Sequence, residues 1–436
     1  MRCVVTAAIF AALALSAPAG AQQTSASGTV KFTVSGIPVI FKPVRANDVV
    51  AVRLYLRGGS ANLTSRTAGI EALMLEAAQE GTRKYDKDAL NERLVETGTE
   101  ISSEAAYDFS VLSVRGVRQH WNEAWDLFSQ VALHPTFPAS EVELVRARML
   151  DQLKRIPDNP DSYVSFLADS TLYAGHAYGA RPGGNPQSMA AIQRDELAAW
   201  HRRRFTKENL LIVVVGNVTR EDVRSKIAEA FGRLPATGGR AVAAGALRPV
   251  TPDVLVVKRE LPTNYILGYF AAPAPSHPDF AALRVATDVL ANRLFEEVRT
   301  KRNLSYAVSA GLGSRAANMG SLYVTAVQPD TTLRVIFSEV KRLQQEPLTP
   351  SRLAENVNTY LTRFWLNQQS SMGQAAQLGA FELIGGGWQN LYRFADAVRR
   401  VSPADVQRVA RKYMQHGRFA VIGDPAKVNR AIYTSF

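Results

Sequence analysis

The chain contains one αβ segment twice, and this repeat limits the folds open to it more than any other feature. Residues 192–217 read IQRDELAAWHRRRFTKENLLIVVVGN, and residues 401–424 read VSPADVQRVARKYMQHGRFAVIGD. Each segment has a polar start, an amphipathic helix with a basic end, and a β-branched strand that ends at glycine. A chain of 436 residues is also too long for one hydrophobic core, so two similar domains are expected.

The fronts of the two halves match as well. Residues 48–60 (DVVAVRLYLRGGS) alternate as a strand that ends in glycines, and residues 263–275 (TNYILGYFAAPAP) have a similar pattern. A helical stretch follows each strand, at 67–80 and at 279–302. We interpret the chain as one αβ unit of about 210 residues that occurs twice.

Strands and helices do not alternate in either half with the rhythm of a βαβ fold. Hairpin-like strand pairs are predicted at 29–42 with 48–57 and at 99–104 with 108–117. They favour an α+β class, in which each unit is a mixed or antiparallel sheet with helices packed on it.

The expected domains follow from the repeat and from composition. The first spans residues 28–234 and the second spans 251–436. Residues 235–250, rich in glycine, alanine and proline, form the predicted linker.

The N-terminus predicts a secretory signal peptide at residues 1–21. Arg2 is followed by the apolar run CVVTAAIFAALALSAPAG, and AGA at 19–21 forms an A-x-A cleavage site. The alternative is a retained membrane anchor. The only cysteine, Cys3, lies in this segment, so the mature chain is expected to have no disulfide and no thiolate ligand. Export without disulfides favours a bacterial periplasm, and no later stretch is long enough to span a membrane.

The net charge is +12, with basic clusters at 201–205, 297–303 and 397–401. A basic balance is typical of partners such as nucleic acid, an anionic surface or acidic peptides. Export argues against nucleic acid, and each cluster taken alone is best interpreted as a solvated helix face.

Three blocks carry a resemblance to a known family. They are SGIPVIFKPVRANDVVAVRLYLRGGSANLTSRTAGIEALMLEAAQEGT (35–82), LYAGHAYGARPGGNPQSMAAI (172–192) and NRLFEEVRTKRNLSYAVSAGL (292–312). In order and spacing they resemble the pitrilysin/insulinase metallopeptidases, also called inverzincins, over nearly the whole mature chain. The closest types are the two-domain bacterial members and the subunits of mitochondrial processing peptidase. The resemblance implies that each domain folds as part of a clam-like shell.

Active members of that family carry H-x-x-E-H on the helix after the first glycine-ended strand. Histidines at i and i+4 share one helix face and bind zinc, and the acid activates the metal-bound water. Aligned on Gly69 and Gly81, the first histidine position holds Ala72, the base position Leu75 and the second histidine position Glu76. The resemblance therefore implies a degenerate metal motif and no zinc in this chain.

The third zinc ligand of the family is a glutamate from a helix some 70 to 80 residues further on. Glu141 and Glu143 are the acids near that place, but neither aligns with it, and Val145 falls near the expected position. The remaining histidines are isolated and offer no pair at ligand spacing: His120, His134, His176, His201, His277 and His416.

The acids of the motif helix itself also need an interpretation. Glu71, Glu76 and Glu80 are expected to lie on a solvated helix face.

The second half keeps residues that the resemblance assigns to peptide binding. The family has an arginine and a tyrosine spaced R-x6-Y, which here are Arg299 and Tyr306. Arg302 is one turn away and is an alternative partner for the peptide. Without the resemblance, the same residues predict an exposed helix end followed by a strand.

Two glycine-rich stretches remain. RPGG at 181–184, after His176, is interpreted as a tight turn, and IGGGW at 384–388 as a loop between helices without a binding role.

The expected function is that of a zinc-free subunit that binds peptide and closes a chamber for a zinc-bearing homologue. Zinc is expected only in that partner, and nucleic acid is not expected to bind. Two alternatives stay open: a structural or assembly protein of the same fold, and a zinc metalloendopeptidase whose site lies in another alignment.

Overall fold

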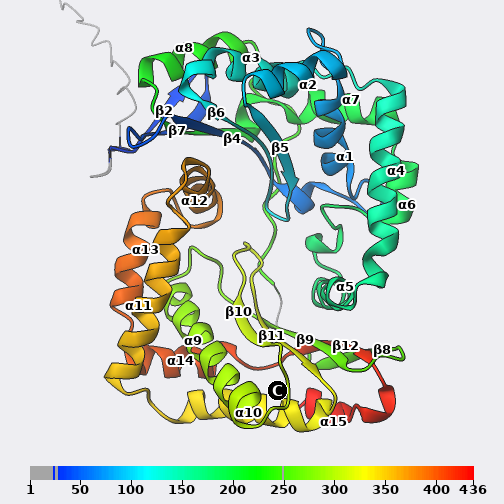
Figure 1. Ribbon diagram of the computed structural model, residues 1–436, viewed down its shortest axis with the longest axis vertical. Coiled ribbons are helices and arrows are strands. Elements are labelled where there is room, and N and C mark those ends of the chain that lie inside the picture. Colours follow the sequence, from blue (N-terminus) through cyan, green and yellow to red (C-terminus); the bar gives the residue numbers. More distant parts are fainter. Residues whose placement is uncertain (1–22, 25–27, 248–249) are drawn as a thin grey trace, which may run out of the picture.

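The computed structural model describes residues 23–24, 28–247 and 250–436, and it contains two sheets with helices on their faces (Figure 1). The expected signal peptide, residues 1–21, lies outside the described residues. Within the described part of the chain, no helix is both long and apolar enough to cross a membrane.

The first half holds a seven-stranded sheet in the order β1-β2-β3-β7-β4-β6-β5. Strands β3 and β7 are parallel, and all other neighbours are antiparallel. The strands are β1 (Gln23–Thr24), β2 (Val30–Val34), β3 (Ile37–Pro43), β4 (Val49–Arg57), β5 (Glu100–Ala105), β6 (Phe109–Val117) and β7 (Leu210–Gly216).

The second half holds a five-stranded sheet in the order β10-β11-β9-β12-β8, in which only β8 and β12 are parallel. Its strands are β8 (Asp253–Lys258), β9 (Asn264–Ala271), β10 (Val308–Leu312), β11 (Met319–Ala326) and β12 (Arg418–Gly423). Read from the parallel pair outward, β3-β7-β4-β6-β5 and β8-β12-β9-β11-β10 have the same order and directions. The internal repeat and the α+β class are therefore confirmed.

The helices repeat in the same way. The first half contains α1 (Ile70–Ala77), α2 (Lys87–Glu96), α3 (Trp121–Leu133), α4 (Ala139–Arg155), α5 (Pro160–Leu172), α6 (Pro186–Ala191), α7 (Arg194–Arg204) and α8 (Arg220–Phe231). The second contains α9 (Asp279–Leu294), α10 (Pro329–Gln345), α11 (Pro350–Leu366), α12 (Ser371–Ile384), α13 (Asn390–Arg399), α14 (Pro403–Tyr413) and α15 (Arg430–Tyr433). Helices α7 and α14 begin 209 residues apart, and α1 and α9 follow β4 and β9 as predicted.

One predicted strand pair is wrong. Residues 29–42 form two strands, β2 and β3, which pair with each other across a turn at Ser35 and Gly36, where both φ angles are positive. Strand β3 does not pair with β4, because β7 lies between them. All seven residues of β7 are buried, as expected of an apolar strand in the middle of a sheet that is covered on both faces. The other predicted pair, β5 with β6, is confirmed.

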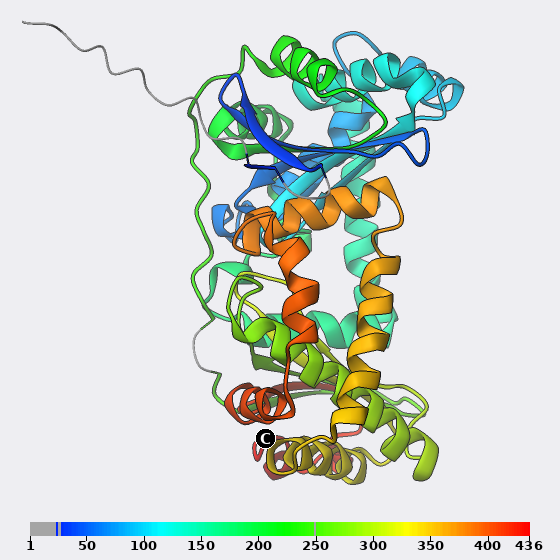
Figure 2. The same cartoon turned by 90° about the vertical axis from the view of Figure 1, so that its left-hand side faces the viewer.

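The two halves exchange helices. Helix α5 of the first half contacts β9 and β12 of the second sheet, and α12 of the second half contacts β4 and β7 of the first sheet (Figures 1 and 2). The Tyr55 hydroxyl on β4 donates to the Ala375 carbonyl of α12 at 3.2 Å. On the other side, Val164 and Leu167 of α5 pack with Leu267 of β9. Because each half covers the other's sheet, neither sheet has a complete core alone.

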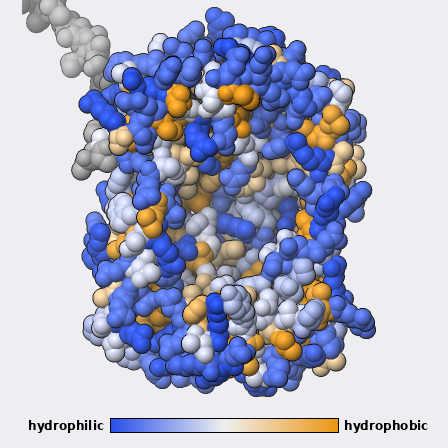
Figure 3. Space-filling view, viewed as in Figure 1, coloured by the Kyte–Doolittle hydropathy of each residue, from blue (hydrophilic) through white to orange (hydrophobic). Residues whose placement is uncertain are grey.

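The tips of two equivalent hairpins also meet where the halves touch. Arg315, in the β10–β11 turn, lies over the Tyr107 ring at 4.1 Å and pairs with Asp169 of α5 at 3.3 Å. Asp108, in the β5–β6 turn, accepts the Ala316 N–H at 3.1 Å. Together with the exchanged helices, these contacts join the halves across a central hollow, which Figure 3 shows open to solvent.

The predicted linker contains no helix or strand in its described residues, since α8 ends at Phe231 and β8 begins at Asp253. It is held along the first half by side chains of that half. The Asn209 side chain donates to the Gly239 carbonyl at 2.9 Å and accepts from the Ala241 N–H at 3.0 Å.

Candidate functional site: the helix after the first glycine-ended strand

Helix α1 begins at a glycine whose replacement the packing does not permit. Gly69 has φ of 89°, in the left-handed region, and a Cβ there would lie 2.9 Å from the Gly184 Cα. Gly184 belongs to RPGG and has φ of 78°. The stretch RPGG is therefore a glycine-dependent turn, as predicted, and it fixes where α1 starts.

The three motif positions do not share one polar face. Leu75, at the base position, is only 2% exposed and belongs to the apolar core of the first half. Ala72 and Glu76, at the histidine positions, lie one turn apart and are half-buried. Ala72 carries no ligand atom, so Glu76 is the only one of these three positions with a side chain able to contact a metal.

The charge of Glu76 is matched by the protein itself. Its carboxylate accepts from the Ser103 hydroxyl of β5 at 2.9 Å and from the Arg148 guanidinium of α4 at 3.2 Å. Arg148 also lies 3.9 Å from Glu80, whose other partner is Lys87 at 2.9 Å. A cation therefore lies next to Glu76, at the position where an active member has its second zinc-binding histidine.

Helix α4 is the expected source of the third ligand, and the residue that reaches α1 from it is Arg148. It lies 72 residues after Glu76 in the sequence. The two acids near the expected third-ligand position pair with other residues. Glu141 pairs with Lys87 at 2.6 Å, and Glu143 pairs with Arg146 at 3.0 Å. Val145 is buried against the core. Arg148 follows Val145 by three residues and so lies on the same helix face, a signal that the sequence contained.

The expectation that Glu71 is solvated is wrong. Its side chain is 1% exposed, because α7 packs across α1 and covers it. The carboxylate accepts from the Ser110 hydroxyl at 2.6 Å and from the Trp200 indole N–H at 3.2 Å, and it lies 3.5 Å from the Arg204 guanidinium. Burial raises the pKa of Glu71 and lowers the pKa of Arg204, although the pair opposes both shifts.

Glu76 and Glu80 differ from Glu71 in exposure. Their side chains are 38% and 15% exposed, and both are paired with cations. The face that contains them is therefore an ion-paired surface between α1 and α4, and the prediction of a freely solvated face does not describe it.

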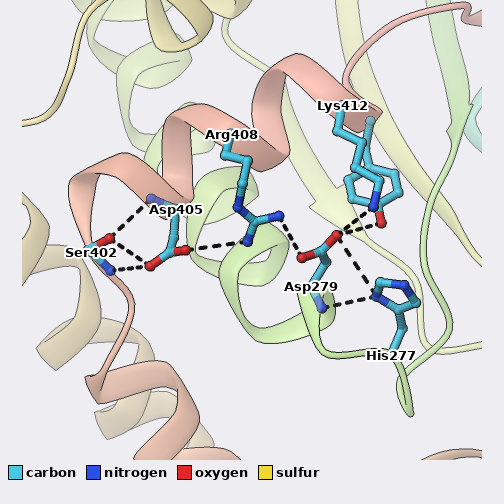
Figure 4. Close-up of polar contacts among 7 residues, drawn as sticks. His277, Asp279, Ser402, Asp405, Arg408 and Lys412 are labelled. Carbon is cyan, nitrogen blue, oxygen red and sulfur yellow. Dashed lines mark hydrogen bonds and ion pairs between the residues drawn. The ribbon is translucent and has the colours of Figure 1, made fainter.

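The second half has an acid at the matching place. Asp279, the first residue of α9, accepts from Arg408 at 2.7 Å, Lys412 at 2.9 Å and Tyr413 at 2.8 Å, all on α14 (Figure 4). Its backbone N–H donates to His277 Nδ1 at 3.0 Å. Burial alone would raise the pKa of Asp279, but the hydrogen bonds from α14 outweigh it and leave that pKa below its usual range.

The structure brings Arg299 and Tyr306 together. The Arg299 guanidinium carbon lies 3.9 Å from the centre of the Tyr306 ring. Arg299 lies in η7 (Phe295–Lys301), a π-helical segment after α9, and Tyr306 lies just before β10. Arg302, the alternative peptide contact, is paired with Glu297. Of the two arginines, Arg299 is thus the one without an ion pair to any residue that the structure describes.

The histidines do not supply the ligands that α1 lacks. His176 contacts the Gly245 carbonyl at 2.9 Å, and His201 contacts the Ala132 carbonyl at 2.9 Å while it stacks on Phe205. Within the described ranges, no group of three or more histidine, cysteine, aspartate or glutamate side chains is arranged to hold a metal ion. The residues around α1 therefore do not fit a catalytic zinc, which needs about three protein ligands.

Comparison with known proteins identifies the family. The profile described as Insulinase (Peptidase family M16) matches residues 39–182, and the profile described as Peptidase M16 inactive domain matches residues 191–360. The chain belongs to peptidase family M16. The resemblance to the pitrilysin/insulinase family is thereby confirmed. The word "inactive" in the second description covers residues that exclude α1, so it does not bear on the motif positions.

Relatives within M16 are distant but match along nearly their whole length. An uncharacterized zinc protease of Mycobacterium tuberculosis is 22% identical over 91% of this chain and 93% of its own length. A mitochondrial-processing peptidase subunit beta of Lentinula edodes is 20% identical over 89% and 87%. A crystal structure of a peptidase M16 inactive domain from Pseudomonas fluorescens has a TM-score of 0.84 at 21% identity, over 91% and 98%. These identities support the fold and leave activity to the residues of this chain.

Proposed function

We propose that this M16 chain is a zinc-free subunit that holds peptide and closes the chamber of a zinc-bearing homologue. The observation that carries the proposal is the pairing of Glu76 with Arg148 on the α1–α4 face, next to Ala72 and Leu75. A guanidinium beside Glu76, the only acid at the three motif positions, opposes a divalent cation. Zinc is proposed only for the partner.

The shape of the molecule supports a role in a pair. The hollow between the halves opens to solvent in Figure 3, and the exchanged helices α5 and α12 join the halves that flank it. Closing the hollow by rotating one half on the linker would break both helix contacts. A second chain can close it without that cost, and one relative is named as a subunit of a peptidase.

The second half supplies the peptide contact in this proposal. Arg299 has N–H donors that suit peptide carbonyls or a carboxylate, and the Tyr306 hydroxyl is able to donate or accept. Tyr306 is 79% exposed, so its ring and hydroxyl are accessible to a peptide.

We also propose export to the periplasm, which rests on the signal peptide predicted at residues 1–21. Nucleic acid is not a proposed partner, despite the net charge of +12.

The test is reconstitution with a zinc-bearing M16 homologue from the same genome. The chain alone, the homologue alone and the mixture are compared for complex formation and for kcat/KM on unfolded peptides. We expect activity mainly in the mixture. Arg299→Ala should lower kcat/KM of the pair about 10-fold or more, since a charged hydrogen bond contributes about 1.5 to 3 kcal/mol. Tyr306→Phe should lower it less.

The other outcomes separate the alternatives. A stable complex without any gain in peptidase activity would favour a structural or assembly role. Chelator-sensitive activity of this chain alone would favour a metallopeptidase with a site elsewhere. No complex and no gain in activity would contradict the proposal outright.

A further inference from the structure

Arg299 lies in an unusual setting at the end of α9. Its guanidinium carbon is 3.9 Å from the centre of the Tyr306 ring and 4.7 Å from the centre of the Phe295 ring. Both rings reach solvent, with Tyr306 79% and Phe295 48% exposed. Exposed aromatic side chains gathered around a cation are typical of binding surfaces. The segment is also π-helical, a rare conformation that occurs frequently at functional sites.

The acids near Arg299 are occupied by other cations. Glu296 pairs with Lys301 at 2.9 Å, and Glu297 pairs with Lys301 at 2.7 Å and with Arg302. Among the residues that the structure describes, the Arg299 side chain has no ion pair and no hydrogen bond, and its guanidinium lies over the two rings. Its N–H groups can therefore donate hydrogen bonds to an acceptor from outside the chain.

We propose that Phe295 and Tyr306 orient Arg299 to bind a carboxylate, so that this chain selects peptides with an acidic side chain. The inference rests on the proposed function, because it names the class of peptide that the subunit holds. The two oxygens of a carboxylate match the guanidinium fork and neutralise its unpaired charge, whereas a neutral carbonyl leaves that charge uncompensated. Phe295 is a positioning residue: it acts through Arg299 and contacts no reacting atom.

The sequence agrees with this arrangement. Phe295 and Arg299 are four residues apart, so their side chains lie on neighbouring turns of one helical face. Tyr306 follows a sharp turn at Asn303, where φ is 51°. That turn brings the tyrosine ring back to the end of the helix.

The experiment uses the full mature chain without any partner. Two fluorescent peptides of identical sequence, one with a glutamate and one with a glutamine at the same position, are titrated at low salt and their Kd values compared by anisotropy. We expect the glutamate peptide to bind about tenfold more tightly, because a charge-assisted hydrogen bond is about twice as strong as a neutral one.

Variants distinguish orientation from charge. Arg299→Lys keeps the charge but loses the fork, and should remove most of the preference. Phe295→Leu should reduce the preference about two- to fivefold at unchanged melting temperature, since cation–π contacts are modest at exposed sites. Arg302→Lys makes the same chemical change at the neighbouring, paired arginine, and should leave the preference intact.

Equal affinity for the two peptides would overturn the carboxylate preference and leave the peptide-holding role standing. A preference that survives in Arg299→Lys would show that another residue supplies it, which also overturns the inference. If neither peptide binds, both the preference and the peptide-holding role of this chain are wrong.

Discussion

In each half, an acidic side chain links two equivalent helices, α1 with α7 and α9 with α14, and we call each of these contacts a clasp. The two acids lie in different surroundings. In the first half, Glu71 of α1 meets Arg204 of α7, and their side chains are 1% and 2% exposed. In the second half, Asp279 of α9 meets Arg408 and Lys412 of α14, whose side chains are 50% and 53% exposed. The pKa is raised for Glu71 and lowered for Asp279.

Both acids link helices at matching places in the two halves. An acid in the first turn of the helix that follows β4 or β9 occurs in both halves, and in both it pairs with the helix that precedes β7 or β12. Such a shared element is explained by the repeat and needs no catalytic role. Glu71 is therefore a helix clasp and no remnant of a metal site.

A second pair of contacts repeats in the same sense. Arg148 of α4 binds Glu76 of α1, and Arg363 of α11 binds Asp288 of α9 at 2.5 Å. Helices α4 and α11 occupy matching places in the two halves. The Arg148 contact thus has a counterpart where the family carries no zinc motif, which supports its role as a link between helices.

The largest expected effect comes from removing the cation of the buried clasp. Arg204→Ala leaves the Glu71 carboxylate buried without its partner and also removes hydrogen bonds to the carbonyls of Arg57 and Gly239. The free energy of unfolding should fall by about 3 to 5 kcal/mol. Denaturant unfolding measures it, with Arg202→Ala, an exposed arginine on the same helix, as the control. A loss below about 1 kcal/mol would mean that the pair contributes no more than a surface contact.

The open clasp should cost less to break. Asp279→Ala removes three charged or hydroxyl contacts, but its cationic partners are half-exposed and regain water. We expect a loss of about 1 to 3 kcal/mol in the same unfolding experiment. If Asp279→Ala proves more destabilising than Arg204→Ala, the ranking of the two clasps by burial is wrong.

The opposite pKa shifts predict two separate pH windows. Asp279, with a lowered pKa, stabilises the fold above about pH 4, and this stability is lost as the pH falls further, so wild type and Asp279→Asn should converge in acid. Glu71, with a raised pKa, favours its protonated form in the fold. Wild type should therefore lose stability relative to Glu71→Gln as the pH rises above about 4.

Chemical unfolding at several pH values between about 2 and 8 measures both differences. Parallel pH profiles for the two variants would show that the surroundings of the two acids do not differ as described.

The smallest effects belong to the exposed links between helices. Arg148→Ala and Arg363→Ala should each lower the free energy of unfolding by about 1 kcal/mol or less, because the arginine side chains are 53% and 56% exposed. Equal small losses would show that the two arginines have the same structural role. A large loss from Arg148→Ala alone would assign the α1–α4 face a role that its counterpart lacks.

Much of the fold was readable from the sequence, because the repeat, the glycine-ended strands and the helix periodicity are local patterns. The central place of β7 was not predicted, although LLIVVVG is apolar on both faces and so indicates a fully buried strand. The exchange of α5 and α12 was not readable, because periodicity shows which face of a helix is apolar and says nothing about which sheet covers it. The burial of Glu71 depends on Trp200 and Arg204, about 130 residues away, and no spacing rule connects them.

We propose that the α1–α4 face of this M16 chain links two helices and holds no zinc. To test this, the purified mature chain is incubated with excess zinc and dialysed, and its metal content is measured by mass spectrometry. Peptidase activity of the same sample is measured before and after addition of a chelator. We expect far less than one zinc per chain and no chelator-sensitive activity. One tightly bound zinc per chain, with peptidase activity that the chelator abolishes, would contradict it.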